Sequence, residues 1–163
     1  MARFIVTCLL LLGIFFTTGC AFQLSGSRVM DYEYLVNDLR LSRVTIEEIM
    51  DVPYPVFDAH GESVFSVGGK SVRIEDEKHL LVLEYENEAA VKTEAGFVSR
   101  DGYDLHKPEG KFYQSIDWIA PPHWYQDGRI IVLYVGENPE IRILLEDLLG
   151  RQFAGQGPAR SIE

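Results

Sequence analysis

Apolar residues recur every three or four positions in three stretches, which predicts three amphipathic helices with one buried stripe each. The stretches are 32–39, 88–97 and 140–149. Each follows a residue whose side chain can cap a helix: Asp31, Asn87 and Asn138. Pro139 suits the first turn of the third helix, and Gly150 is placed to end it.

Between these stretches lie short runs rich in Val, Ile, Leu and aromatic residues, which are typical of short strands. The predicted strands are 43–50, 63–67, 70–74, 80–83, 112–119, 123–125 and 130–135. Gly68-Gly69 and Asp127-Gly128 predict tight hairpin turns. The run 80–83 is apolar at every position, as expected of a central strand covered on both faces.

Strands linked mainly by hairpins, together with a few helices, predict an α+β fold. We expect an antiparallel-dominated sheet of about six strands, with two or three helices mainly on one face. The step from Leu83 through the helix 88–97 to Phe112 allows one parallel pair within the sheet. A single globular domain is predicted over residues 31–153, and residues 154–163 are expected to form a disordered tail.

The N-terminal residues have the pattern of an export signal. A single positive charge, Arg3, precedes a 13-residue apolar stretch at 4–16. We interpret residues 1–19 as a signal peptide and residues 20–30 as a flexible tether. The alternative is an uncleaved transmembrane anchor, because residues 4–22 carry no charge and approach bilayer length.

The segment Thr17-Thr18-Gly19-Cys20 resembles the lipobox of bacterial lipoproteins, in which small residues precede a cysteine that is lipidated and becomes the new N-terminus. Thr17 stands where that family usually has Leu. The resemblance implies that Cys20 carries acyl chains such as palmitate. It also implies export and lipid anchoring to the membrane: the periplasmic side of the outer membrane if the host is Gram-negative. Cys8 leaves with the signal peptide, so no free thiol remains in the exported domain.

Several later segments are similar to a group of uncharacterised bacterial lipoproteins. The most specific are Trp-Ile-Ala-Pro-Pro-His-Trp-Tyr at 118–125 and Ile-Ile-Val-Leu-Tyr-Val-Gly at 130–136. The other similar segments are 83–85, 99–102 and 149–155. The resemblance implies kinship with envelope lipoproteins, but it brings no assigned activity or catalytic residue.

Charge narrows the class of function. The chain has 25 acidic and 15 basic residues among 163, a formal net charge of −10. Residues 1–19 contain one basic residue, Arg3, and no acid, so the rest carries 25 acidic and 14 basic residues, or −11. Such a surface repels polyanions, so we expect no nucleic-acid partner and no attraction to anionic lipid headgroups.

One candidate ligand pocket surrounds a pair of prolines. Its residues are Asp117, Trp118, His123, Trp124 and Tyr125. Aromatic rings beside an ionisable group can line a pocket, with His123 as acid or base and Asp117 as its orienting partner. The alternative is a kinked edge strand whose rings are buried and whose His123 bonds to a backbone carbonyl.

A second candidate is a metal site formed by Asp58, His60 and Glu62. These residues alternate, so an extended chain would point all three the same way, and their donor atoms suit a divalent metal. The alternative is a solvated turn around Gly61. We expect His79 and His106 to be separate surface residues.

These patterns favour a membrane-anchored cell-envelope lipoprotein that is a non-enzymatic binding or accessory domain without a cofactor. Its expected partners are the membrane, through Cys20, and an envelope protein. The alternative is a small hydrolase or metal-dependent enzyme that uses Asp117 with His123, or Asp58, His60 and Glu62. The sequence contains no Gly-x-Ser-x-Gly or His-Glu-x-x-His motif and no Gly-rich phosphate loop.

Overall fold

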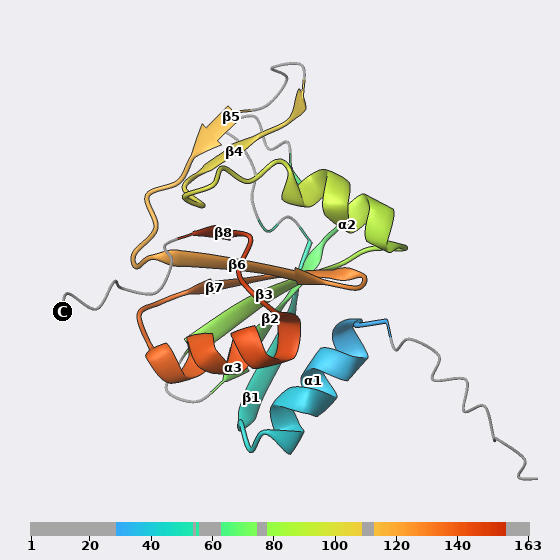
Figure 1. Cartoon of the computed structure of the whole chain (residues 1–163), viewed down its shortest axis with the longest axis vertical. Helices are drawn as coiled ribbons and strands as arrows, with labels where there is room; N and C mark the ends of the chain where they lie inside the picture. The colour runs from blue at the N-terminus through green and yellow to red at the C-terminus, as the bar shows by residue number, and fades with distance from the viewer. Residues whose placement is uncertain (1–28, 54, 56–62, 75–77, 109–112, 156–163) are drawn as a thin grey trace, which may run out of the picture.

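The computed structural model describes residues 29–53, 55, 63–74, 78–108 and 113–155 (Figure 1). The helices within this part are α1 (Tyr32–Leu41), α2 (Glu88–Ala95) and α3 (Pro139–Leu149). The strands are β1 (Ile46–Val52), β2 (Gly69–Ile74), β3 (Lys78–Glu84), β4 (Asp104–His106), β5 (Tyr113–Ser115), β6 (Pro122–Asp127), β7 (Ile130–Val135) and β8 (Ala154–Gly155).

Six of these strands form one sheet in the order β1-β2-β3-β7-β6-β8, and β4 and β5 form a separate small sheet. Every pairing between the described strands is antiparallel. The α+β prediction is therefore confirmed, but the parallel pair is wrong. Because β7 occupies the edge of β3, the chain that leaves β3 through α2 enters the small β4–β5 sheet instead.

Helices cover both faces of the six-stranded sheet, with α1 and α3 on one face and α2 with the β4–β5 sheet on the other (Figure 1). Two of the three helices thus share a face. Strand β3 alternates between the two cores: Leu80 and Val82 pack with α1 and α3, whereas Leu83 packs with α2. The prediction that 80–83 is covered on both faces is confirmed.

The helices begin where the sequence predicts. The carboxylate of Asp31 accepts a hydrogen bond from Tyr34 N at 3.0 Å, and the Asn87 side chain accepts one from Ala90 N at 3.0 Å. Asn138 caps α3 in the same way. These contacts satisfy backbone donors that the first turn of a helix leaves unpaired.

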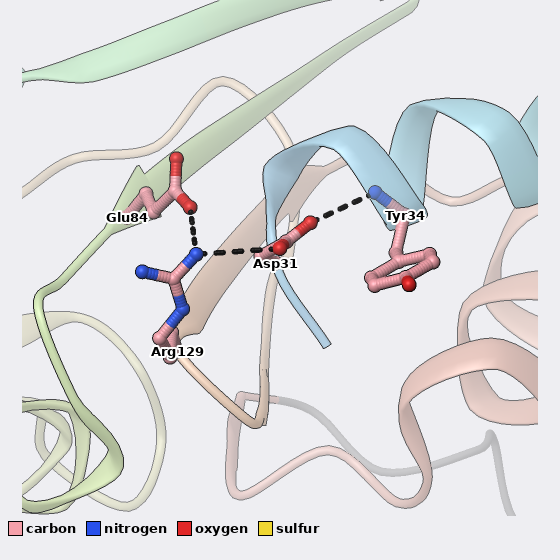
Figure 2. Close-up of polar contacts among 4 residues, drawn as sticks. All are labelled: Asp31, Tyr34, Glu84 and Arg129. Atoms are coloured by element: carbon pink, nitrogen blue, oxygen red, sulfur yellow. Dashed lines mark hydrogen bonds and ion pairs between the residues drawn. The ribbon is translucent and has the colours of Figure 1, made fainter. Parts of the chain in front are cut away.

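Arg129, in the turn between β6 and β7, joins three elements (Figure 2). Its Nη2 lies 2.9 Å from Glu84 Oε1 at the end of β3 and 3.3 Å from Asp31 Oδ2 at the start of α1. Its backbone N–H donates to Met30 O at 2.8 Å. Asp31 therefore caps α1 with one oxygen and contacts the guanidinium with the other, which fixes where α1 meets the sheet.

The predicted strand 63–67 and its Gly68-Gly69 hairpin turn are wrong. Residues 64–67 bend, and this bend buries Phe65 against Trp124, with ring centroids 6.0 Å apart. Gly69 begins β2 instead of turning the chain. A Cβ at Gly69 would lie 2.8 Å from Leu81 Cδ1, so this glycine is needed for close packing.

Other boundaries also differ from the predictions. Residues 44 and 45 precede β1, because Arg43 has a φ of 64° and closes the end of α1. Among the described residues of the predicted strand 112–119, only Tyr113–Ser115 form a strand. Ala154 and Gly155 are not part of a tail, because they pair with Trp124 and His123 as β8. Residues 156–163 lie outside the described part.

None of the described helices has the length and hydropathy needed to cross a bilayer. The predicted signal peptide at 1–19 and the alternative anchor at 4–22 lie outside the described residues.

Gly128 provides a test of how α1 docks. Its φ is +51°, and a Cβ there would lie 2.5 Å from Met30 N. We expect Gly128→Ala to lower the free energy of unfolding by about 2–4 kcal/mol, from left-handed strain and steric overlap together. Urea denaturation of the intact chain measures this change.

Gly128→Asn separates the two causes, because Asn tolerates a positive φ better than Ala but adds the same Cβ. Both variants should be strongly destabilised if contact with Met30 dominates. Near-complete recovery of stability in Gly128→Asn would contradict this account.

Candidate functional site

The five residues predicted to share a pocket do not converge. Side chains alternate between the two faces of a sheet along a strand, so β6 places His123 and Tyr125 on the face of α1 and α3, and Trp124 on the face of α2. Trp118 joins Trp124 on the α2 face. Asp117 is exposed. A pocket built from all five residues is therefore not formed.

The two tryptophans form a structural pair. Their rings meet edge to face, with centroids 6.3 Å apart and an interplanar angle of 69°. Both indole N–H groups donate to the same acceptor, Gly102 O, at 3.0 Å from Trp118 and 3.3 Å from Trp124. Gly102 has a φ of +80°, and a Cβ there would lie 2.9 Å from the Trp124 ring. The pair therefore anchors the turn before β4.

His123 is only 1% exposed, and both of its ring nitrogens have partners. Nε2 lies 3.0 Å from Gly136 O, and Nδ1 lies 2.9 Å from Gln152 Oε1. The ring also stacks on Tyr134, with centroids 5.9 Å apart. Since both nitrogens are engaged, Asp117 does not orient this imidazole.

Tyr125 is buried beside α3. Burial, reinforced by the negative charge of Glu146 and partly offset by Arg142, raises the pKa of Tyr125 to about 12. Its phenol is therefore neutral at physiological pH and does not serve as a base.

A buried carboxylate occurs on the opposite face of the sheet. Glu94 of α2 is 8% exposed and accepts from Ser66 N at 3.0 Å and 3.3 Å, one contact through each oxygen. Burial and the adjacent Glu94 raise the pKa of Tyr85 far above its usual value. This carboxylate holds the bend at 64–67 against α2, which is a structural role.

The candidate metal ligands Asp58, His60 and Glu62, like Cys20, lie outside the described residues. Within the described part, no group of three or more His, Cys, Asp or Glu side chains is arranged to hold a metal ion.

The structure forms a concave, mostly apolar site, which we call the groove. It has a volume of about 420 Å³ and lies on the α2 face of the sheet. Its lining comes from β2, β3, β7, the end of β1 and the chain before β6. The lining residues are Val52, Pro55, Ser71, Lys78, His79, Leu81, Trp118, Ile119, Leu133, Tyr134, Val135 and Gly136.

The groove lies where the described residues leave the α2 face of the sheet incompletely covered. Helix α2 has eight residues, so it is about 12 Å long, and it packs over β6 and β7. The side chains of Leu81 and Leu133, which are paired across β3 and β7, remain at the floor of the groove. Ile119 at the rim is 100% exposed.

Polar groups lie on the β2–β3 side of the groove. Ser71 Oγ lies 3.1 Å from His79 Nδ1, and Lys78 is the residue before His79. His79 is exposed, as predicted, but it is paired with Ser71. Of the predicted pocket residues, only Trp118 lines the groove. The remaining signal in the sequence is the uniformly apolar run of β7, which does not show where coverage of the sheet ends.

The chain matches no protein-family model, no curated protein and no solved structure. The likeness to bacterial lipoproteins therefore depends on the sequence segments alone.

We expect His123→Ala to lower the free energy of unfolding by about 2–3 kcal/mol, because it removes a buried ring together with its hydrogen bonds to Gly136 O and Gln152 Oε1. Asp117→Asn is the matched control, since Asp117 is exposed, and should change stability by less than about 0.5 kcal/mol. Denaturant titration of both variants measures this. Equal losses in the two variants would indicate an Asp117–His123 interaction and contradict the structural role.

Proposed function

We propose that this chain is an exported, lipid-anchored envelope protein whose folded domain is a non-enzymatic binding module. The observation that carries this proposal is the groove. Its volume of about 420 Å³ lies within the range of about 300–1,000 Å³ that is usual for small-molecule sites.

The rim of the groove supports a binding role. Ile119 is fully exposed, and Trp118 lies next to it in the lining. Large apolar side chains that gather around a concavity are typical of sites that a ligand covers. The groove therefore offers apolar contact area that the fold itself leaves in water.

The hydrolase alternative receives less support. His123 has both ring nitrogens engaged, and Asp117 is not one of their partners. The metal-dependent alternative, with Asp58, His60 and Glu62, stays a prediction. A binding role, unlike the catalytic alternatives, requires only the apolar surface of the groove.

The anchoring part of the proposal comes from the lipobox-like segment ending at Cys20. The described chain begins beside the β6–β7 turn, where Met30 O accepts from Arg129 N. The residues between Cys20 and Met30 can extend to about 30 Å. A domain tethered in this way remains close to the membrane surface, where apolar and amphiphilic ligands are concentrated.

Replacing the proposed lipidated cysteine tests the anchor. Cells that express the intact chain are labelled with radioactive palmitate, and we expect Cys20→Ser to abolish the label because it removes the acylated thiol. Cys8→Ser is the matched control and should retain the label, since Cys8 lies in the predicted signal peptide. An unlabelled but membrane-bound and uncleaved wild-type chain would support the transmembrane alternative instead.

Labelling with a light-activated apolar probe tests the groove. The intact chain in phosphatidylcholine vesicles is irradiated with a medium-chain alcohol that carries a diazirine, and labelled peptides are identified by mass spectrometry. We expect Ile119→Asp to lower labelling of the groove about five-fold, because apolar contact is lost.

Ile143→Asp is the matched control. Ile143 is 60% exposed on α3, at the opposite face of the sheet, so its substitution should leave labelling of the groove unchanged. Equal effects of the two substitutions, or no labelling of groove peptides, would argue against the groove as a ligand site.

A further inference from the structure

We infer that Asp101 is a positioning residue for the groove: it orders the turn at 99–103, and this turn holds Trp118 in the groove lining. The inference rests on the proposed binding function of the groove and names what keeps that site in shape. It also gives a role to the segment 99–102, which is among those similar to bacterial lipoproteins.

Trp118 lies between β5 and β6, in a stretch that belongs to no helix or strand. Its place in the groove lining is therefore not set by strand pairing. Two hydrogen bonds connect this stretch to the 99–103 turn. Trp118 Nε1 donates to Gly102 O at 3.0 Å. Ile116 N donates to Tyr103 O at 2.9 Å.

The 99–103 turn supports the groove from outside. The described lining of the groove includes Trp118 and Ile119 but no residue of the turn. The turn therefore affects the groove through the stretch that it holds. The carbonyl of Gly102 is the central contact, because it accepts the indole N–H groups of both Trp118 and Trp124.

The Asp101 side chain is exposed, yet it orders this turn. Its Oδ1 accepts a hydrogen bond from the Ser99 hydroxyl and another from Tyr103 N, the latter at 3.2 Å. These bonds, above all the one from Ser99, lower the pKa of Asp101, so the side chain is a carboxylate at neutral pH. Gly102 N donates to Ser99 O at 2.8 Å. One carboxylate thus connects the residues before and after Gly102.

Substitution of Asp101 tests the inference. The intact chain in phosphatidylcholine vesicles is irradiated with the diazirine-bearing alcohol, and labelling of peptides with Trp118 and Ile119 is normalised to labelling of the lipid. We expect Asp101→Ala to lower this labelling about two- to five-fold, the effect of losing one ordering hydrogen bond. Asp101→Asn keeps an Oδ1 acceptor, so it should retain wild-type labelling.

Asp147→Ala is the matched control. Asp147 is an exposed aspartate of α3, which covers the opposite face of the sheet (Figure 1), so its loss should leave labelling of the groove unchanged. Urea denaturation of each variant checks that it remains folded under the labelling conditions.

A double substitution tests whether Asp101 acts through the indole. Trp118→Phe keeps an aromatic ring in the lining but removes the N–H that Gly102 O accepts. Adding Asp101→Ala to Trp118→Phe should therefore lower labelling by much less than Asp101→Ala does in the wild-type chain. Losses that simply multiply would overturn the inference, because Asp101 would then act by another route.

Hydrogen exchange of the indole N–H groups gives a readout that a general loss of stability does not reproduce. The chain has two tryptophans, so nitrogen-15 spectra of the intact chain in phosphatidylcholine nanodiscs contain two indole signals, and Trp118→Phe identifies that of Trp118. We expect Asp101→Ala to accelerate exchange of the Trp118 signal and to leave that of Trp124, which is 0% exposed, protected. Equal acceleration of both signals would overturn the inference.

The failure of this inference differs from the failure of the proposed function. Wild-type labelling of the groove that Asp101→Ala leaves unchanged would overturn the positioning role and leave the binding function standing. No labelling of the wild-type groove, with the lipid labelled normally, would overturn both.

Discussion

The structure depends on the burial of β7 from both sides. All six of its residues are apolar or aromatic, and five of them are buried. A strand of this kind is stable only when material packs above and below the sheet. Antiparallel pairing with β3 and β6 provides hydrogen-bond partners for the backbone of β7. This pairing lies within the sheet, so the two faces of β7 must be covered by other parts of the chain. Helices α1 and α3 provide one layer, and α2 with the small β4–β5 sheet provides the other.

The two layers cover different shares of the sheet, and the proposed binding function depends on this difference. Helices α1 and α3 have 10 and 11 residues and close their face with a continuous core. Helix α2 has only eight residues and packs over β6 and β7. The part of this face towards β1, β2 and β3 keeps apolar side chains such as Leu81 in contact with solvent. A ligand that occupies the groove would cover apolar side chains that the described residues leave in contact with solvent.

Local polar contacts then set the positions of the layers. Asp31 caps α1 and also contacts Arg129, so the N-terminal helix is fastened to the β6–β7 turn (Figure 2). On the other face, Glu94 holds the bend that brings Phe65 against Trp124. These polar side chains lie at the borders of the apolar layers. Hydrophobic burial is not directional, so their hydrogen bonds determine how the packed elements are oriented.

The sequence by itself determined the elements whose signals are local. Helix caps such as Asn87 and the hairpin at Asp127-Gly128 depend on neighbouring residues along the chain, so the pattern predicts them correctly. The two-sided burial of 80–83 depends on distant helices, but its signal is local, because every residue of that run is apolar. Only the tertiary structure decided which residues form the site. His123 and Trp124 are adjacent in sequence but lie on opposite faces because side chains alternate along β6, whereas Ser71, Leu81 and Leu133 come together through strand pairing. The groove lies where the layer containing α2 ends. The position of that end depends on long-range packing rather than on any local sequence pattern.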